Sequence, residues 1–451
     1  MINKIFQYHR SSKHNQHAFA PGPGYLDWAS QPDPFRRYEG AKTLPLIKTI
    51  TTEKPSFSES LTPKRVPNRL LNIESVSQLF FDSLALSAWK SFQGTKWALR
   101  VNPSSGNLHP TEGYLVCGPL QGLIDKPSVF HYSPEIHGLE IRTHFSIETW
   151  KKMEVPQGTI FIGLSSIHWR EAWKYGHRAY RYCHHDIGHA LAAINISCSG
   201  LGWQTYLMDH LTHSDLETIL GLPKKQDVEL EVPDCLIAIL TKGENENICL
   251  SKRDFTQGFS DLTWQGTPNI LSKSHMEWPG INEVAESTRK TESSYPNKVQ
   301  REFSSNLIKD DSFPLRKAIH QRRSAVAMDK KTRMDRDIFY QFLIKTIPNA
   351  CPLPFQTFTW ESQVHLGLFV HRVNDLPQGL YFLVRNPNHI EELKKTFNTH
   401  FKWEKPEDCP TELDLFLLEE YDCRSMATGV SCGQEIAGDG CFSLGMISAF
   451  E

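Results

Sequence analysis

The sequence predicts an α+β fold, because strand-like apolar runs alternate with helical patterns along its first half. Apolar runs of strand length occur at Tyr114–Cys117, Val129–Tyr132 and Thr159–Leu164. Between Arg178 and Ser199, apolar residues recur at steps of three and four, which predicts a long amphipathic helix. Strands and helices therefore mix within one layered unit.

The elements can be placed in order along this half. A helix is expected at Leu79–Ser87, before the first strands. The helix Arg178–Ser199 has a wide apolar face, which indicates deep burial, and ends before Gly200. Two further strands are expected at Trp203–Met208 and Leu236–Leu240. The helix His213–Leu220 separates them, with Ser214 as its expected N-cap.

Length and composition limit the classes of protein. A chain of 451 residues exceeds what one core usually supports, so two or more units are expected. A formal net charge of −2 with no basic domain argues against a nucleic-acid partner. The longest apolar runs are far shorter than the ~20 residues that cross a bilayer, so no membrane association is expected. The beginning lacks an apolar signal stretch, and the 10 cysteines form no framework, which favours a reducing cytoplasm.

The most informative loop lies between Pro103 and Pro110. Ser104, Ser105 and Asn107 can both donate and accept hydrogen bonds, and Gly106 permits backbone angles that are closed to other residues. Such a loop could bind the polar edge of a heterocycle. The alternative is an ordinary turn before the strand.

Three further motifs follow this loop: Lys174-Tyr175-Gly176 within residues 166–181, Asp186-Ile-Gly-His189, and Gly200-Leu-Gly-Trp203. Together with the loop, they resemble the SagB-type, thiazoline-oxidase-like branch of the FMN-dependent nitroreductase superfamily. Residues 8–14 and 26–40 resemble the opening of the tandem members of this branch. The resemblance spans most of residues 1–284. It implies a nitroreductase-like mixed sheet flanked by helices, and FMN as cofactor.

A second copy is expected after the first. Trp278 and Pro279 resemble the family's connecting arm, and Glu286–Ser312 has the composition of a linker. Residues 313–325 look like a fresh start of the same superfamily. The strands His365–Val370 and 379–383 then answer to those at Tyr114 and Val129, and 442–451 answers to 161–166. The expected domains are 1–266 (FMN-binding unit), 267–312 (arm and linker) and 313–451 (incomplete second unit).

Nothing in the second copy answers to Lys174–Tyr180, the Asp186–His189 helix or Gly200–Gly202. A strand without its following helix would leave an apolar face uncovered. We therefore expect either a shortened product or a degenerate half that the first half supports. The two copies would form a pseudo-dimer within the chain, or the chain would form a homo-oligomer. Whether Glu451 is the natural end is left open.

The resemblance implies three groups of flavin contacts. Arg10, Ser12, Lys13 and His14 would lie at the phosphate, although they could equally be an exposed basic tail. Ser104, Ser105 and Asn107 would line the ring edge. Arg100 would lie close by to stabilise the reduced flavin, or would form a surface ion pair instead. Gly188 and His189, on the long helix in a tightly packed zone, complete the set.

The resemblance assigns catalysis to Lys174 and Tyr175. Aromatising an azoline ring removes a carbon-bound proton and a hydride, so a base must face the flavin across the substrate. Lysine serves as a base only if burial or a cationic neighbour lowers its pKa, and Arg170, Arg178 and Arg181 are candidate neighbours. The alternative is a solvated lysine with a tyrosine packed under it.

Other chemistries find less support. His185 and His189 lie one helical turn apart, but no further ligand cluster accompanies them, so no metal is expected. No Gly-x-Gly-x-x-Gly follows a strand and no Walker-type loop is present.

Three functions remain. The favoured one is an FMN-dependent dehydrogenase that oxidises a carbon–heteroatom single bond, such as that of an azoline, on a small or peptide-derived substrate. The second is an NAD(P)H-dependent nitro or quinone reductase. The third is an inactive flavin-binding or dimerisation protein. The electron acceptor and the substrate are not identified by the sequence.

Overall fold

The computed structural model describes residues 2–15, 18–48, 52–62, 64–223, 227–242, 252–293, 308–309 and 311–450. Two compact units are present. Unit 1 comprises Met1–Pro55, Pro63–Pro296 and Pro314–His320, and unit 2 comprises Ser56–Thr62, Asn297–Phe313 and Gln321–Glu451. Each unit therefore contains a segment from both halves of the sequence. The expected linker, Glu286–Ser312, lies largely outside the described residues, and the sequence-based domain boundaries stay a prediction.

The core of unit 1 is a seven-stranded antiparallel sheet in the order β2-β7-β6-β5-β8-β10-β9. The interior strand β8 is buried along its whole length and pairs with the central strand β5 on one side and with β10 on the other. A hairpin, β3-β4, and a short pair, β1-β11, complete the strands. The bounds are β1 Tyr38–Glu39, β2 Thr43–Pro45, β3 Leu86–Phe92, β4 Thr95–Arg100, β5 Thr111–Cys117, β6 Ser128–Ser133, β7 Gly138–His144, β8 Thr159–Ile167, β9 Gln204–Leu207, β10 Glu231–Leu240 and β11 Thr267–Pro268.

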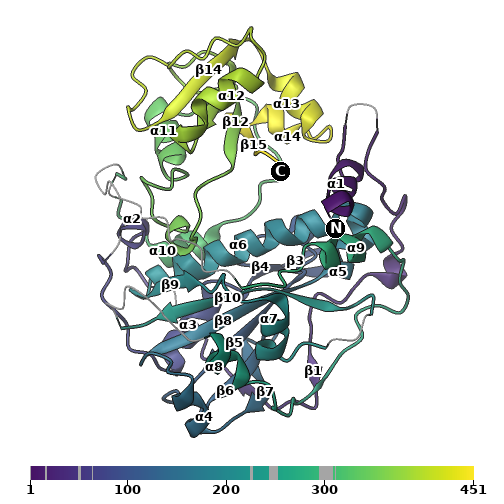
Figure 1. Ribbon diagram of the computed structural model, residues 1–451. Coiled ribbons are helices and arrows are strands. Elements are labelled where there is room, and N and C mark those ends of the chain that lie inside the picture. Colours follow the sequence, from purple (N-terminus) through teal and green to yellow (C-terminus); the bar gives the residue numbers. More distant parts are fainter. Residues whose placement is uncertain are drawn as a thin grey trace. The chain divides into compact units, whose positions relative to one another are not determined.

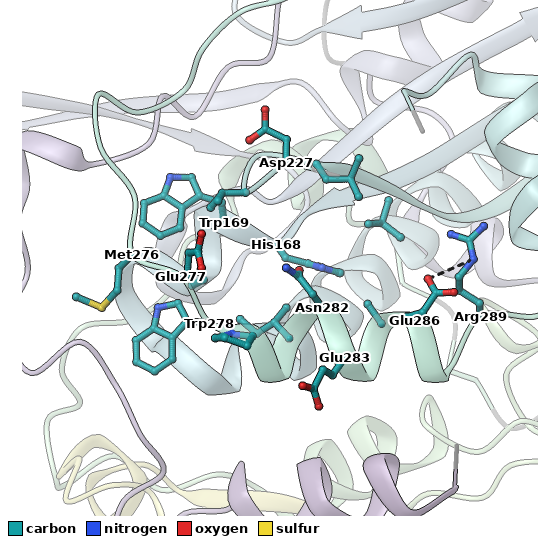
Figure 2. A pocket seen from close by; sticks show the side chains of 17 residues that line it. His168, Trp169, Asp227, Met276, Glu277, Trp278, Asn282, Glu283, Glu286 and Arg289 are labelled. Atoms are coloured by element: carbon teal, nitrogen blue, oxygen red, sulfur yellow. Dashed lines mark ion pairs between the residues drawn. The ribbon is translucent and has the colours of Figure 1, made fainter. Parts of the chain in front are cut away.

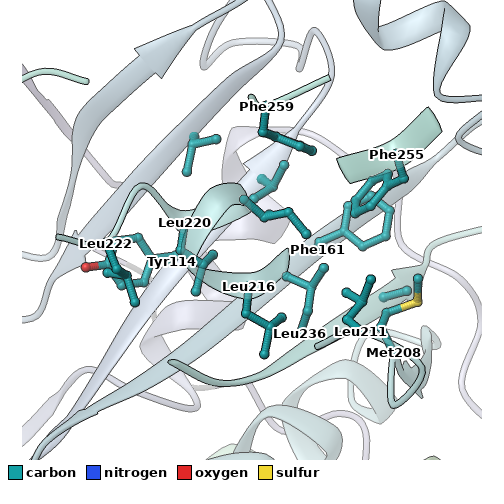
Figure 3. Packing of buried hydrophobic residues seen from close by; sticks show 14 of the residues in the cluster. Tyr114, Phe161, Met208, Leu211, Leu216, Leu220, Leu222, Leu236, Phe255 and Phe259 are labelled. Carbon is teal, nitrogen blue, oxygen red and sulfur yellow. The ribbon is translucent and has the colours of Figure 1, made fainter. Parts of the chain in front are cut away.

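Helices cover both faces of this sheet (Figure 1). On one face, Tyr114 of β5 and Phe161 of β8 pack with Leu216 and Leu220 of α7 and with Phe255 of α8 (Figure 3). The helix α6 lies along the opposite face, next to α3. The helical bounds are α1 Ile2–Ser11, η1 Trp28–Ser30, α3 Ile73–Phe81, η2 Ser105–Asn107, α4 Ile147–Lys152, α5 His168–Tyr175, η3 Gly176–Arg178, α6 Ala179–Ser199, α7 His213–Leu220, α8 Lys252–Gln257, α9 Pro279–Ser287 and α10 Leu315–Gln321.

The predicted α+β class and most predicted elements are confirmed. The long helix runs from Ala179 to Ser199, one residue short of its predicted start. Two details were wrong. The helix expected at Leu79–Ser87 ends at Phe81, and Leu86 already begins β3. The N-cap of α7 is Thr212 rather than Ser214, because Thr212 and Asp215 form a reciprocal capping box.

Helix α10, expected to open the second copy, is part of unit 1. Its Arg316 is buried and donates from Nε to Oδ2 of Asp82 at 3.0 Å. His320 contacts the other oxygen of the same carboxylate at 2.9 Å. Leu315 is fully buried, and its backbone amide donates to the Pro55 carbonyl at 3.0 Å. Helix α10 thus supplies part of the polar and apolar interior of unit 1.

Unit 2 has a four-stranded antiparallel sheet in the order β14-β13-β12-β15. Phe339 and Leu343 of α11 pack on one face, and Ile390 and Leu393 of α12 on the other. The order equals that of β7-β6-β5-β8 in unit 1, and the three strands named in advance, β12, β13 and β15, are present. The bounds are α2 Phe57–Leu61, α11 Arg336–Ile344, η5 Phe355–Thr357, β12 His365–Val370, β13 Gly379–Val384, η6 Pro387–His389, α12 Ile390–Thr396, β14 Asp414–Glu420, α13 Arg424–Val430, α14 Ile436–Asp439 and β15 Phe442–Ile447.

Candidate functional site

The predicted site residues lie mainly on α1, η2, α5 and α6 of unit 1. A sharp turn at Gly176 joins α5 to α6, with φ of 53° and ψ of −128°. An added Cβ at Gly176 would lie 2.8 Å from Cα of Gly22 and 2.8 Å from the ring of Trp278. Only glycine fits both the angles and the space. The turn therefore sets the direction in which the chain leaves α5, directly after Lys174 and Tyr175.

The loop that was predicted to bind a ligand edge meets the predicted catalytic tyrosine. Gly106 has φ of 57°, and a Cβ at this position would lie 2.5 Å from Oη of Tyr175. The phenol therefore rests against the backbone of the loop. The structure brings these two predicted parts together, although they are far apart in the sequence.

Asp186 of α6 holds this loop in place. Its Oδ1 accepts hydrogen bonds from the Ser105 amide and from Oγ of Ser105, both at 2.9 Å. Burial raises the pKa of Asp186, while the bonds from Ser104 and Ser105 oppose that shift. Sequence reasoning placed Asp186 in a motif but gave it no role.

The polar side chains of the loop are mostly bonded within the protein. Ser104 Oγ accepts from the His109 amide at 2.8 Å, and Asn107 Nδ2 donates to the Ala98 carbonyl at 2.9 Å. Among the described residues, Oδ1 of Asn107 has no hydrogen-bond partner. In this conformation the loop therefore offers a ligand Asn107 Oδ1 rather than three free side chains.

Lys174 and Tyr175 form a half-buried pair. Nζ of Lys174 lies 5.4 Å from the centroid of the Tyr175 ring, which packs against Tyr182 at 4.5 Å between centroids. Burial and the carboxyl of Glu171 raise the pKa of Tyr175 to about 12. The phenol keeps its proton near neutral pH and can act as a hydrogen-bond donor.

Glu171, one turn before Lys174, was missed by the sequence reasoning. It is fully buried, and neither carboxyl oxygen has a hydrogen-bond partner among the described residues. Burial and the neighbouring Asp186 raise its pKa well above the usual range, with Lys174 opposing the shift. Glu171 is therefore a buried carboxyl without a hydrogen-bond partner among the described residues, one helical turn from Lys174.

The predicted phosphate residues meet two arginines of the α6 region. Ser12 is fully buried; its Oγ accepts from Nε of Arg181 at 2.7 Å, and its carbonyl accepts from Arg178. Arg10 and Lys13 are exposed on the same segment. In the described part of the chain, none of these four cations has a carboxylate within ion-pair distance. These four residues form a cationic cluster (Arg10, Lys13, Arg178 and Arg181): two of them neighbour Ser12 in the sequence region of α1 and two bond to Ser12, and such a set of cations suits an anion.

Other predicted residues lie elsewhere or differently. Arg100 is buried and donates to the carbonyls of Thr111 at 3.0 Å and Pro34 at 2.6 Å, and burial lowers its pKa to about 10. It forms no surface ion pair. Gly188 was expected in a tightly packed zone, which is wrong: a Cβ there would meet nothing within 4 Å. His189 is half exposed, with Nδ1 3.9 Å from Oδ1 of Asp186. The surface of α6 around Gly188 is therefore open.

The described residues contain neither a metal-binding cluster nor a membrane-spanning helix. No group of three or more histidine, cysteine, aspartate or glutamate side chains among them could hold a metal ion. No helix in the described part is long and apolar enough to cross a membrane.

The comparison with family models finds a match within unit 1. Residues 92–238, from the end of β3 into β10, match the model of the nitroreductase family. These residues form a nitroreductase-family domain. It contains the Ser104–Asn107 loop, the Lys174–Tyr175 pair and the whole of α6.

Individual relatives agree with this domain. A putative nitroreductase of Methanocaldococcus jannaschii is 22% identical over 158 residues, which cover 34% of this chain and 75% of that protein. The crystal structure of a putative nitroreductase from Anabaena variabilis matches with a TM-score of 0.63 and 17% identity, over 99% of this chain and 85% of that one. This likeness shows a nitroreductase-like fold. The E. coli microcin synthetase McbBCD complex matches over 44% of this chain with 16% identity and a TM-score of 0.32, which is too low to show a common fold.

Proposed function

We propose that unit 1 is an FMN-dependent oxidoreductase that dehydrogenates a carbon–heteroatom single bond, such as that of an azoline ring, in a small or peptide-derived substrate. The contact between Tyr175 and Gly106, with Lys174 alongside, carries this proposal. This contact places a potential base beside a loop that lies next to an open surface of α6. All of these parts belong to the nitroreductase-family domain.

The residues present fit a flavin best at its phosphate. Arg178, Arg181 and Lys13 near Ser12 supply cationic donors, and no carboxylate of the described residues lies within ion-pair distance of them. At the ring edge, Asn107 Oδ1 and the open surface around Gly188 would provide the contacts. When bound, FMN would accept a hydride from the substrate carbon.

The protein's own groups would handle the proton. Nζ of Lys174 would take the carbon-bound proton of the substrate. The Tyr175 phenol, which keeps its proton, would donate a hydrogen bond to the substrate heteroatom and orient the ring.

The test uses the full chain with FMN and a peptide that carries a single thiazoline. We expect a flavin absorbance spectrum in the purified protein, and conversion of thiazoline to thiazole. Lys174→Ala should keep the spectrum and lose at least 100-fold in the rate at which the peptide reduces the bound flavin in a single anaerobic turnover. The exposed Lys151→Ala serves as the matched control. Retained turnover in Lys174→Ala would contradict the assigned role, and anaerobic bleaching by NADPH without peptide oxidation would favour a reductase.

We also propose that unit 2 is a second, incomplete copy of unit 1. Its strand order, β14-β13-β12-β15, repeats β7-β6-β5-β8, and within the described residues it has no counterpart of β10 or β9. The pair of copies would act as a pseudo-dimer, or the chain would assemble with a second copy. Sedimentation of the FMN-loaded chain distinguishes the two.

A further inference from the structure

Unit 1 contains a cavity of about 440 Å³ that the proposed flavin chemistry does not use. It lies between α5, α9 and the segment that leads into β10. Figure 2 shows two indoles, of Trp169 and Trp278, on one side of the cavity, with His168 and Asn282 near its centre.

The cavity does not include the residues of the candidate active site. On α5, His168, Trp169 and Ala172 line it, whereas Tyr175, at the end of the helix, contacts the backbone of Gly106. Neither Lys174 nor the Ser104–Asn107 loop lines the cavity. A ligand in the cavity would therefore not occupy the site proposed for FMN.

The aromatic walls are held in position. Trp169 donates from Nε1 to Oγ of Ser272 at 2.7 Å, and its ring packs against His275 at 5.0 Å between centroids. Trp278 packs against Gly176, where an added Cβ would lie 2.8 Å from the indole. Its Nε1 is buried and has no hydrogen-bond partner among the described residues.

His168 is a second polar group left without a partner. Its side chain is 8% exposed and borders the cavity. It packs edge-on against Tyr180 at 5.5 Å, but neither ring nitrogen has a hydrogen-bond partner in the described part of the chain. Buried polar groups usually have partners, so the unpartnered His168 ring, which borders the cavity, indicates that a ligand completes this site.

The charge around the cavity is negative. Four carboxylates and one guanidinium line it. Glu286 and Glu283 are paired, with Arg289 at 3.9 Å and Lys4 at 3.7 Å. Asp227 and Glu277 have no cationic partner among the described residues, and Glu277 adjoins Trp278. Both carboxylates are exposed, and a cation against the indole of Trp278 would lie close to Glu277.

We propose that this cavity binds an organic cation, an ammonium or guanidinium group on an apolar stem. The stem would lie along Val228, Leu230 and Ile281, and the cationic group would lie against the indole of Trp278, close to Glu277. A ring nitrogen of His168 would accept a hydrogen bond from an N–H of the cationic group. A basic side chain of a peptide and a free amine share this chemistry.

The test is calorimetric titration of the full chain with benzylamine and, as the charge-reversed control, benzoate. We expect saturable binding of one benzylammonium per chain, and at least tenfold weaker binding of benzoate. Acetylated and amidated Gly-Arg-Gly distinguishes the sources: tighter binding than benzylamine assigns the site to a peptide, and weaker binding assigns it to a free amine. Equal binding of benzylamine and benzoate, or no binding of any cation, would overturn the proposal.

Variants place the binding in this cavity. Glu277→Lys changes an exposed residue, and Trp278→Ala removes one wall; each should weaken benzylammonium at least tenfold. Glu148→Lys on α4 is the matched control and should leave binding unchanged. If Trp278→Ala lowers the melting temperature, Trp278→Phe and Glu277→Lys decide. Unchanged binding in Glu277→Lys would contradict the site, whereas the flavin spectrum tests the proposed function separately.

Discussion

At the scale of single residues, buried charged groups position the candidate active site. Asp186 is the clearest case, because one carboxylate accepts both the amide and the hydroxyl of Ser105. Hydrogen bonds to an ionised acceptor are stronger than neutral ones, by roughly twofold. The loop therefore owes its shape to a side chain on another element.

Replacing Asp186 tests this tether. Asp186→Ala should weaken FMN binding at least tenfold and speed amide hydrogen exchange at Ser105 and Gly106, because the loop loses its anchor. Flavin fluorescence titration and exchange mass spectrometry measure the two effects. The exposed Asp125→Ala is the control, and unchanged exchange in Asp186→Ala would contradict the tether.

A second buried group makes stability depend on pH. His131 lies 3.0 Å from Oε2 of Glu112 and 2.8 Å from Oε2 of Glu140. Burial alone would lower its pKa, but the two carboxylates raise it to about 9. Because the folded pKa lies above the unfolded value of about 6.5, the protonated ring stabilises the fold fully below pH 6.5. This contribution is lost as pH rises through about 9.

We therefore expect the free energy of unfolding in urea to fall between pH 6.5 and 9.5. His131→Gln should be less stable at pH 6 and should show a smaller decline over the same range. His144→Gln on the neighbouring strand removes a histidine whose pKa burial lowers, so it should keep the decline. A flat profile in the unmodified chain would rule out this role for His131.

At the scale of elements, helix α10 shows that a segment can belong to a unit far from it in the sequence. Arg316 and Asp82 are 4% and 1% exposed, and 234 residues separate them. Arg316 also donates to Oγ1 of Thr52 at 2.7 Å and to the Lys54 carbonyl at 2.8 Å. The helix therefore closes a polar interior that unit 1 could not satisfy without it.

Breaking this pair should be costly. Arg316→Met removes the guanidinium that pairs with the buried Asp82, and we expect a loss of about 3–5 kcal/mol in the free energy of unfolding. Asp82→Leu in the same chain should recover much of it, because the buried charge is then gone. Lys4→Ala, which breaks an exposed pair, should cost about 0.5 kcal/mol or less. Urea denaturation measures all three, and a loss below about 1 kcal/mol in Arg316→Met would contradict the argument.

Local sequence patterns explain which features could be predicted, and long-range contacts explain which features could not. Helix α6 was placed within one residue because its apolar period extends over 21 residues and glycine follows it. Thr212 followed by Asp215 is the sequence pattern of the capping box of α7, whereas the predicted N-cap is Ser214. The burial of Arg100 and the placement of α10 depend on partners in other elements, for which a single sequence carries no local signal. The open surface at Gly188 likewise depends on where other elements lie, which local sequence does not indicate.

At the scale of the whole molecule, strands β8 of unit 1 and β15 of unit 2 differ in their pairing. In unit 1, β8 is paired on both sides and buried throughout. In unit 2, β15 pairs with β12 alone among the described strands and is exposed over most of its length. Its apolar residues include Leu444, 47% exposed, and Met446, 65% exposed. An unpaired apolar edge strand is a template for pairing with another chain.

We therefore expect the chain to self-associate through β15 as its concentration rises. Sedimentation velocity over 1–100 µM should show a species larger than the monomer. Met446→Lys places a charge on the edge and should raise the dissociation constant at least tenfold, since lysines on edge strands oppose pairing. Phe342→Lys changes an apolar residue of α11 that is 47% exposed but lies off the edge, so it should leave association unchanged. If Phe342→Lys weakened association and Met446→Lys did not, a surface other than β15 would mediate it, and the exposure of this strand would have no role in assembly.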